Sequence, residues 1–170
     1  MLQSLRKKRA THRAYKRAVD DCLAVLFCGF PKGIPPSLRQ RLDNSILVRR
    51  GQAEGTDARA CSVQAAVVVM RTIIGSLSQQ ERQELTQAFL RNDASNPTYK
   101  GFTYMFRVVE LLNVSPGLVS YLNIELAGHL RGMSQEAIFN SWIDAQVGRV
   151  IGRLRERSRE EAEIKKDLWQ

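Results

Sequence analysis

The stretch Ala65-Ala-Val-Val-Val-Met70 decides the expected fold, because all six of its residues are apolar. A helix with this composition has no polar side to turn toward solvent, which is typical of a helix buried in a protein core. We therefore predict a helix over residues 57–74 that lies at the centre of a helical bundle. The β-branched valines lower its intrinsic helix propensity, so burial against neighbouring helices must stabilise it.

Two helices are predicted on the N-terminal side of this segment from apolar residues that recur every three or four positions. The first covers residues 3–28, and its second half carries the apolar stripe: Tyr15, Val19, Cys22, Leu23 and Leu26. We expect the apolar part of this helix to pack into the core. Glycines and prolines in residues 29–36 end the helix. The second helix is expected over residues 37–48.

Four more helices are predicted on the C-terminal side, over residues 78–92, 101–113, 116–131 and 134–168. Ser78 and Glu81 form a capping-box pattern, and Ser115-Pro116 has the residues of an N-cap followed by a first helical turn. The fold class is therefore all-α, with about seven helices packed as one or two small bundles. Three segments follow from these bounds: a basic N-terminal helix or extension (1–32), a helical core (33–133) and a long C-terminal helix with a charged end (134–170).

The predicted C-terminal helix has two different halves. Its first half has an apolar face: Ile138, Phe139, Trp142, Ile143, Val147, Val150, Ile151 and Leu154. Its second half is mostly charged, with opposite charges four residues apart, as in Arg157 and Glu161. This half is either a projecting solvated helix or a contact arm for another subunit.

The net charge of +9 is carried entirely by the first 50 residues, which hold 12 Lys or Arg against 3 Asp or Glu (12 − 3 = +9). Residues 51–170 hold 14 of each sign. The densest cluster contains no acidic residue and consists of Arg6, Lys7, Lys8, Arg9, Arg13, Lys16 and Arg17. Such asymmetry predicts an anionic partner, either a membrane surface or nucleic acid. On a helix the seven residues occupy most of the circumference, which favours loose electrostatic contact over reading of a nucleic-acid groove.

Nothing in the sequence indicates catalysis or a bound cofactor, and we predict that the chain is not an enzyme. It has two histidines, His12 in the basic cluster and His129 in a predicted helix, and no Ser or Cys in a recognisable nucleophile motif. The segment Gly29-Phe-Pro-Lys-Gly33 lacks the spacing of a phosphate-binding loop. Its three cysteines, none in a CxxC pair, predict neither zinc nor a disulfide framework, and favour a reducing compartment.

Membrane contact, if present, is expected to be peripheral. No apolar run reaches the roughly 18 residues that span a bilayer. The apolar run at residues 22–30 begins late and has no small-residue cleavage pattern, so a signal peptide is not predicted.

Scattered residues of the central segment match the pattern of a known family. They include Glu81-Arg82, followed by Phe89-Leu90 and Asn92, then Phe106-Arg107, and then Ser120-Tyr121 with Leu126-Ala127. Residues 33–42 and 65–77 match further helices of the same pattern. Over roughly residues 33–133 the chain thereby resembles the N-terminal domain of influenza-type (orthomyxovirus) matrix proteins.

The resemblance implies a viral matrix protein that self-associates, binds anionic membrane and links the envelope to ribonucleoprotein or RNA. It implies a location beneath the envelope of the virion, and in the infected cell the cytoplasm, the inner face of the membrane and the nucleus. The family's basic motif is absent from residues 101–113, where Arg107 stands beside Val108-Val109-Glu110, and its Cys/His cluster is absent too. The expected contact residues are therefore the seven of the N-terminal cluster. Two alternatives stay open: a nucleic-acid-binding regulatory or packaging protein, and an intracellular helical adaptor.

Overall fold

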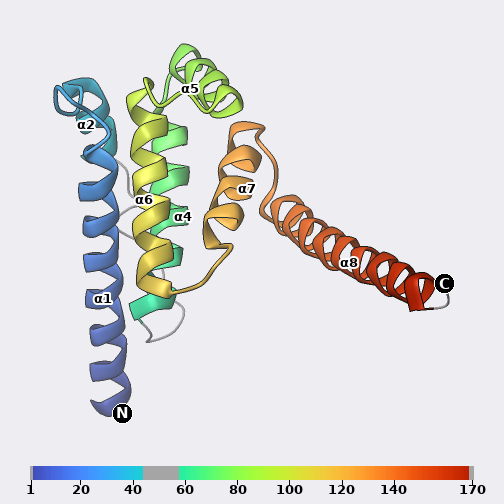
Figure 1. Ribbon diagram of the computed structural model, residues 1–170. Coiled ribbons are helices and arrows are strands. Elements are labelled where there is room, and N and C mark those ends of the chain that lie inside the picture. The colour runs from blue at the N-terminus through green and yellow to red at the C-terminus, as the bar shows by residue number, and fades with distance from the viewer. Residues whose placement is uncertain (1, 44–57, 169–170) are drawn as a thin grey trace. The chain divides into compact units, whose positions relative to one another are not determined.

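The computed structural model describes residues 2–43 and 58–168, which form seven helices and no strand (Figure 1). This confirms the predicted all-α fold. The helices are α1 (Leu2–Phe27), α2 (Pro36–Asp43), α4 (Ala58–Ser76), α5 (Gln79–Arg91), α6 (Pro97–Asn113), α7 (Leu118–Leu130) and α8 (Gln135–Leu168). Residues 44–48 of the second predicted helix lie outside the described residues.

The chain divides into two compact units, Met1–Gly132 and Met133–Gln170. The second unit is the long helix α8, whose first turn is capped by Ser134 because its hydroxyl accepts the Ala137 N–H at 3.2 Å. The first unit contains α1 together with the central helices. Charged pairs such as Arg157 and Glu161 do not close into ion pairs among the described side chains of α8.

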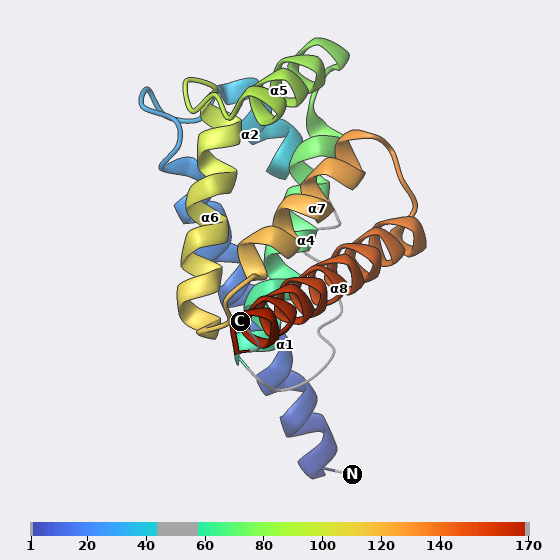
Figure 2. The same cartoon turned by 45° about the vertical axis from the view of Figure 1, so that its right-hand side comes forward.

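Helix α4 is the centre of the first unit, as the sequence predicted. It contacts α1, α2, α6 and α7, and the view in Figure 2 shows α7 lying along it. Ala65, Ala66, Val69 and Met70 are fully buried, whereas Val67 and Val68 are only partly buried. The core is completed by α1, which buries Tyr15, Val19, Cys22 and Leu26, and by three of the four aromatic residues of α6: Tyr99, Phe102 and Phe106. The predicted packing of the apolar half of α1 is thus confirmed.

Two helix starts differ from the sequence prediction. Helix α6 begins at Pro97 and not at residue 101, because the Asn96 side chain accepts the Tyr99 N–H at 3.0 Å and Pro97 fits the first helical turn. Helix α7 begins at Leu118 after Gly117, which has a φ of 95° and no side-chain cap. The Ser115-Pro116 pair therefore lies in the turn that precedes this helix and does not cap it.

The C-terminal end of α1 touches the N-terminal part of α6 through backbone atoms. A Cβ atom placed on Gly29 would overlap backbone atoms of Pro97 and Gly101. One placed on Gly101 would overlap the carbonyl oxygen of Leu26. Only glycine, which has no Cβ atom, allows the two backbone segments to approach this closely. The contact fixes α1 and α6 at one end, and the two antiparallel helices both extend from it toward the other end of the unit (Figure 1).

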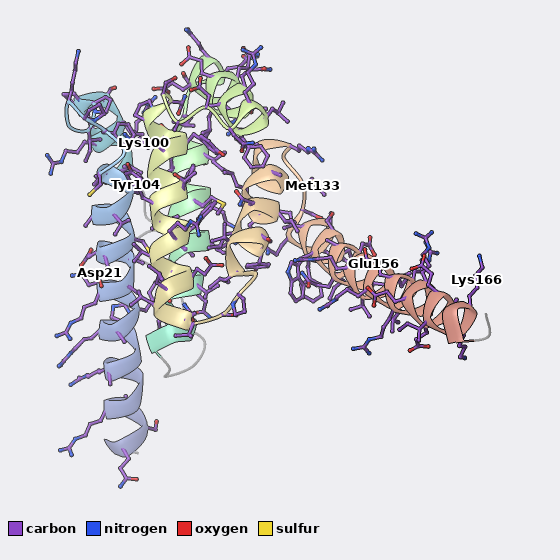
Figure 3. The ribbon with its side chains drawn as sticks, in the orientation of Figure 1. Asp21, Lys100, Tyr104, Met133, Glu156 and Lys166 are labelled. Atoms are coloured by element: carbon purple, nitrogen blue, oxygen red, sulfur yellow. The ribbon has the colours of Figure 1, made fainter. Side chains whose placement is uncertain are left out.

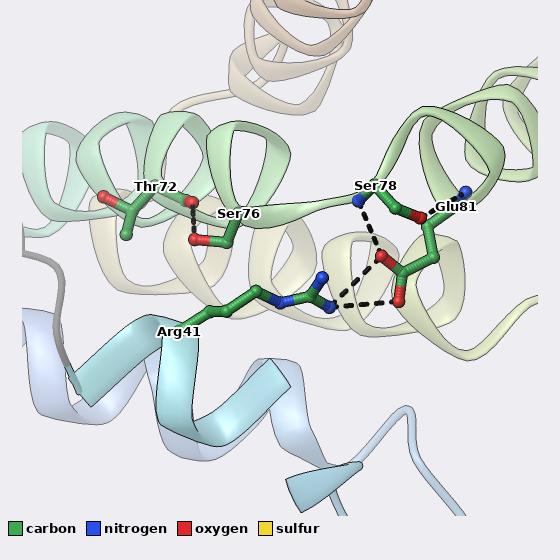
Figure 4. A network of polar contacts seen from close by, with 5 residues as sticks. All are labelled: Arg41, Thr72, Ser76, Ser78 and Glu81. Atoms are coloured by element: carbon green, nitrogen blue, oxygen red, sulfur yellow. Dashed lines mark hydrogen bonds and ion pairs between the residues drawn. The ribbon is translucent and has the colours of Figure 1, made fainter. Parts of the chain in front are cut away.

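An ion pair joins α2 to the start of α5 (Figure 4). A terminal nitrogen of Arg41 lies 3.1 Å from both carboxylate oxygens of Glu81. Glu81 also accepts the Ser78 N–H at 2.7 Å, while the Ser78 hydroxyl accepts the Glu81 N–H at 3.2 Å, which completes the predicted capping box. The backbone bond from Ser78, opposed by partial burial and helped by Arg41, lowers the pKa of Glu81. One carboxylate therefore caps α5 and holds α2 against it.

The glycine contact makes a testable prediction. Gly101→Ala should lower the free energy of unfolding by about 2–3 kcal/mol, because the added methyl group overlaps the α1 backbone. Urea unfolding followed by circular dichroism measures the change. Gly75→Ala is the control, since Gly75 is helical with no atom within 4 Å of the position that a methyl group would take, and it should be neutral or stabilising by roughly 0.5–1 kcal/mol. Equal effects of the two substitutions would contradict the close contact.

Candidate functional site

Helix α1 consists of a packed half and an exposed half. Tyr15 is its first buried side chain, and the described side chains before it are exposed, apart from the half-buried Ala14 next to it. In Figures 1 and 2 the N-terminal turns of α1 extend beyond the ends of α4 and α6. The exposed half is helical over its whole length, so its side chains have a defined angular order around the helix axis.

Five of the seven predicted contact residues share one side of α1, which we call the basic face: Arg6, Arg9, Arg13, Lys16 and Arg17. At about 100° per residue, these positions fall within an arc of about 100°. Their spacing of three and four residues puts them on the side of the helix away from the buried Tyr15, Cys22 and Leu26. All five are exposed, and Figure 3 shows nitrogen-tipped side chains projecting from this part of α1, away from α6.

The remaining two predicted residues, Lys7 and Lys8, belong to α1, but their side chains lie outside the described part of the structure. The seven positions together surround most of the helix, so no single stripe was expected from them. Five of the seven nevertheless share one arc, with the spacing 6, 9, 13, 16 and 17, while positions 7 and 8 fall outside that arc by helical register. A one-sided stripe can meet a flat anionic surface with all its charges at once.

The basic face has a strongly positive environment. No Asp or Glu precedes Asp20 in the sequence, so the exposed half of α1 contains no acidic residue. Among the described side chains, none of the five cations is within ion-pair distance of a carboxylate. The charges are therefore directed to solvent, where a phosphate or carboxylate of a partner can reach them.

A groove of about 390 Å³ runs beside the basic face, between α1 and α6. Ala14, Ala18 and Val25 line it from α1, while Val108 and Leu112 line it from α6, and Arg17 and Asp21 are also among its lining residues. Cys22 borders the groove, and its burial, together with the nearby Asp21, raises the pKa of its thiol to about 12. The thiol is protonated at neutral pH, so Cys22 is not an activated nucleophile.

A buried polar network on α7 was not anticipated from the sequence. Glu125 is 1% exposed, accepts the Tyr121 hydroxyl at 2.7 Å and lies 3.1 Å from Nε2 of His129. Nε of Arg71, on α4, donates to the same His129 nitrogen at 3.2 Å. That nitrogen can either donate to Glu125 or accept from Arg71, so the proton position on His129 decides which contact is a hydrogen bond. The i,i+4 spacing of Tyr121, Glu125 and His129 was the available signal.

The network stabilises the charged form of Glu125. Burial raises the pKa of this carboxyl, but the hydrogen bonds from His129 and Tyr121 and the charge of Arg71 outweigh burial, so the pKa lies below its ordinary value. Burial and the bond to Glu125 raise the pKa of Tyr121. The cluster thus ties α7 to α4, with Glu125 held in its charged form and Tyr121 in its protonated form.

Substitution of Glu125 should show that its charged form stabilises the folded protein. Glu125→Gln should lower the free energy of unfolding by about 1–3 kcal/mol at neutral pH, because it removes a charged acceptor from a buried network. Since the folded pKa of Glu125 is lowered, its contribution is present above the unfolded pKa of about 4.3 and is lost as pH falls through the folded pKa. Urea unfolding across pH should therefore show the two proteins converging as the pH falls below that unfolded pKa and Glu125 becomes protonated in the folded protein. A difference that persists at the acidic end would contradict this assignment.

The described residues contain no helix that is long and apolar enough to cross a membrane. Nor do the described His, Cys, Asp and Glu side chains gather in a group of three or more that could hold a metal ion.

Comparison with protein-family models, with curated proteins and with solved structures found no match to this chain. The resemblance to influenza-type matrix proteins therefore stays a prediction from the residues quoted above.

Proposed function

We propose that this chain is a matrix-type structural protein, without catalytic activity, that self-associates and binds anionic membrane peripherally through the basic face. The observation that carries the proposal is the one-sided array of five exposed cations on the exposed half of α1. Each Lys or Arg near an anionic lipid surface contributes about 1 kcal/mol. Five such contacts give a weak, reversible attachment that salt screens, because the charges act over roughly the Debye length.

Self-association is assigned to α8. Six exposed apolar residues follow one side of this helix within an arc of about 120°: Phe139, Ile143, Val147, Val150, Ile151 and Leu154. Ile143, Val147, Val150 and Leu154 have the four- and three-residue spacing of a coiled-coil seam. The helix holds seven basic and seven acidic residues, so a second copy is not repelled by net charge. We call this side of α8 the apolar seam.

Self-association and weak membrane contact strengthen each other. When two protomers are joined and one basic face is bound, the other basic face is held near the membrane at a high effective concentration. The joined pair therefore binds the membrane more tightly than either protomer alone. A layer formed in this way lies on the inner face of an envelope or membrane, the place that the resemblance implies. Ribonucleoprotein or RNA is the proposed partner on the other side of the layer.

Nucleic acid is the alternative ligand of the basic face. The exposed half of α1 is an isolated helix, and a helix of this width fits the major groove of a duplex. Binding through phosphate contacts alone would show a steep decline in affinity with salt and little sequence preference. Parallel titrations with RNA or DNA and with vesicles therefore separate the two functions.

The membrane proposal is tested by co-sedimentation with vesicles of phosphatidylcholine alone or mixed with phosphatidylserine. A variant with Gln at Arg6, Arg9, Arg13, Lys16 and Arg17 should bind the anionic vesicles at least about tenfold more weakly, because its surface charge is removed. The matched control carries Gln at five other exposed cations, Lys32, Arg39, Arg91, Arg107 and Arg131, and changes the net charge equally. If the unmodified chain fails to bind anionic vesicles even at low salt, the membrane role is wrong.

The apolar seam is tested by sedimentation velocity over a range of protein concentrations. Val147→Glu should weaken self-association by about tenfold or more, since it puts a carboxylate into an apolar contact. Arg149→Gln, which lies off the seam and also lowers the net charge by one, should leave the association unchanged. An unmodified chain that stays monomeric at every concentration would contradict assembly through α8.

A further inference from the structure

The C-terminal end of α6 carries three exposed apolar residues, which we call the apolar tip: Leu111, Leu112 and Val114. Their exposed fractions are 75%, 57% and 77%. Each is a large apolar side chain whose exposure to water is unfavourable. Together they form a small cluster at one end of the first unit.

Val114 adds a backbone anomaly to this cluster. It ends α6 with a φ of 49° and a ψ of 38°, in the left-handed region that β-branched residues rarely adopt. Helix α5 ends in the same conformation, with a φ of 52°, but there the residue is Asn92, whose side chain tolerates it. At Val114 the chain places an exposed apolar group where a polar residue would be less strained. Such strain is a reason to look for a function at this position.

The apolar tip lies beside the basic face. The helices α1 and α6 are antiparallel, and both extend from the Gly29–Gly101 contact toward the same end of the unit, so the end of α6 lies beside α1 near Ala14. Ala14, Arg17 and Leu112 line the same groove, which places the tip at the level where the exposed half of α1 begins. In Figure 2, too, the N-terminal turns of α1 extend beyond the end of α6. Apolar and cationic groups therefore share one end of the first unit.

We propose that the apolar tip inserts among the lipid chains of an anionic bilayer whose headgroups contact the basic face. The inference rests on the proposed membrane function and adds the residues that enter the membrane. Peripheral proteins bind most firmly when an apolar group and cations act on the same surface, because headgroups meet the charges while the acyl region takes the apolar residues. A second copy of the chain is a poorer occupant, since it would bring two basic faces together.

If the apolar tip inserts into the bilayer, part of the vesicle binding should persist at high salt. At low salt the basic face supports attachment, whereas at high salt the charges are screened and the tip has to hold the protein. Substitutions in the tip should therefore act most strongly at high salt. Substitutions in the basic face should act most strongly at low salt.

The test uses the full chain and vesicles of phosphatidylcholine with phosphatidylserine. Val114→Asn is the informative variant, because Asn fits the left-handed conformation and should preserve or raise the unfolding temperature. It should weaken binding at high salt about threefold, and the double variant Leu111→Gln/Leu112→Gln about tenfold or more. Leu90→Gln is the matched control, since Leu90 is 61% exposed and lies on α5, at the other end of the unit. It should bind like the unmodified chain.

A second measurement reports insertion directly. A polarity-sensitive dye is attached to Val114→Cys or, as control, to Leu90→Cys, each with Cys28→Ser because Cys28 is the exposed native thiol. Cys22 and Cys61 are buried. Vesicles should shift the emission of the dye at position 114 to shorter wavelength, and should leave the dye at position 90 unchanged.

The outcomes separate the inference from the proposed function. If the chain binds anionic vesicles through the basic face, but the dye at position 114 does not shift and the tip variants bind normally, insertion is wrong and the membrane function stands. If tip variants reduce self-association in solution and not vesicle binding, the tip contacts a second copy and the inference is also wrong. If no vesicle binds at low salt, the proposed function fails, and the inference fails with it.

Discussion

The backbone contact between Gly29 and Gly101 is the constraint on which the first unit depends. It allows α1 to approach α6 without an intervening side chain, and it does so at one end of both helices. Because the contact is at that end, the opposite end of α1 is free to extend past α6. The same geometry that closes the core at the glycines therefore leaves the basic half of α1 exposed. It also sets the last turn of α6 beside that half, where Arg17 and Leu112 line one groove.

Much of the fold was predictable because its signals are local. The all-apolar segment at residues 65–70 and the Ser78–Glu81 capping box depend on residues close in sequence, and both were found where expected. The start of α6 was misplaced because Asn96 and Pro97 are equally typical of a loop and of a helix start. Only the bond from Tyr99 to the Asn96 side chain decides between them. Val114 could not have been predicted as a left-handed cap, since its side chain disfavours that conformation.

The candidate site was predicted in composition and only partly in arrangement. Counting charges located the basic cluster, and helical register applied to the predicted helix would also have shown the shared arc of positions 6, 9, 13, 16 and 17. The apolar tip was not anticipated, because Leu111 and Leu112 continue the pattern of a packed helix. Both side chains are nevertheless exposed in the folded unit. The Glu125 network needs Arg71, which lies on another helix.

The separation of charge from apolar contact gives the proposed assembly a way to be reversible. The basic face holds five of the twelve cations of the positive first 50 residues, while α8 is electrically balanced, so the two surfaces respond differently to salt. Weak single contacts are an advantage in such a layer, because affinity multiplies with the number of joined protomers and disappears when they part. A protomer with a much stronger membrane anchor would remain attached after the layer came apart. Exposed cations and a tip of only three apolar residues are therefore the chemistry expected of an attachment that assembly controls.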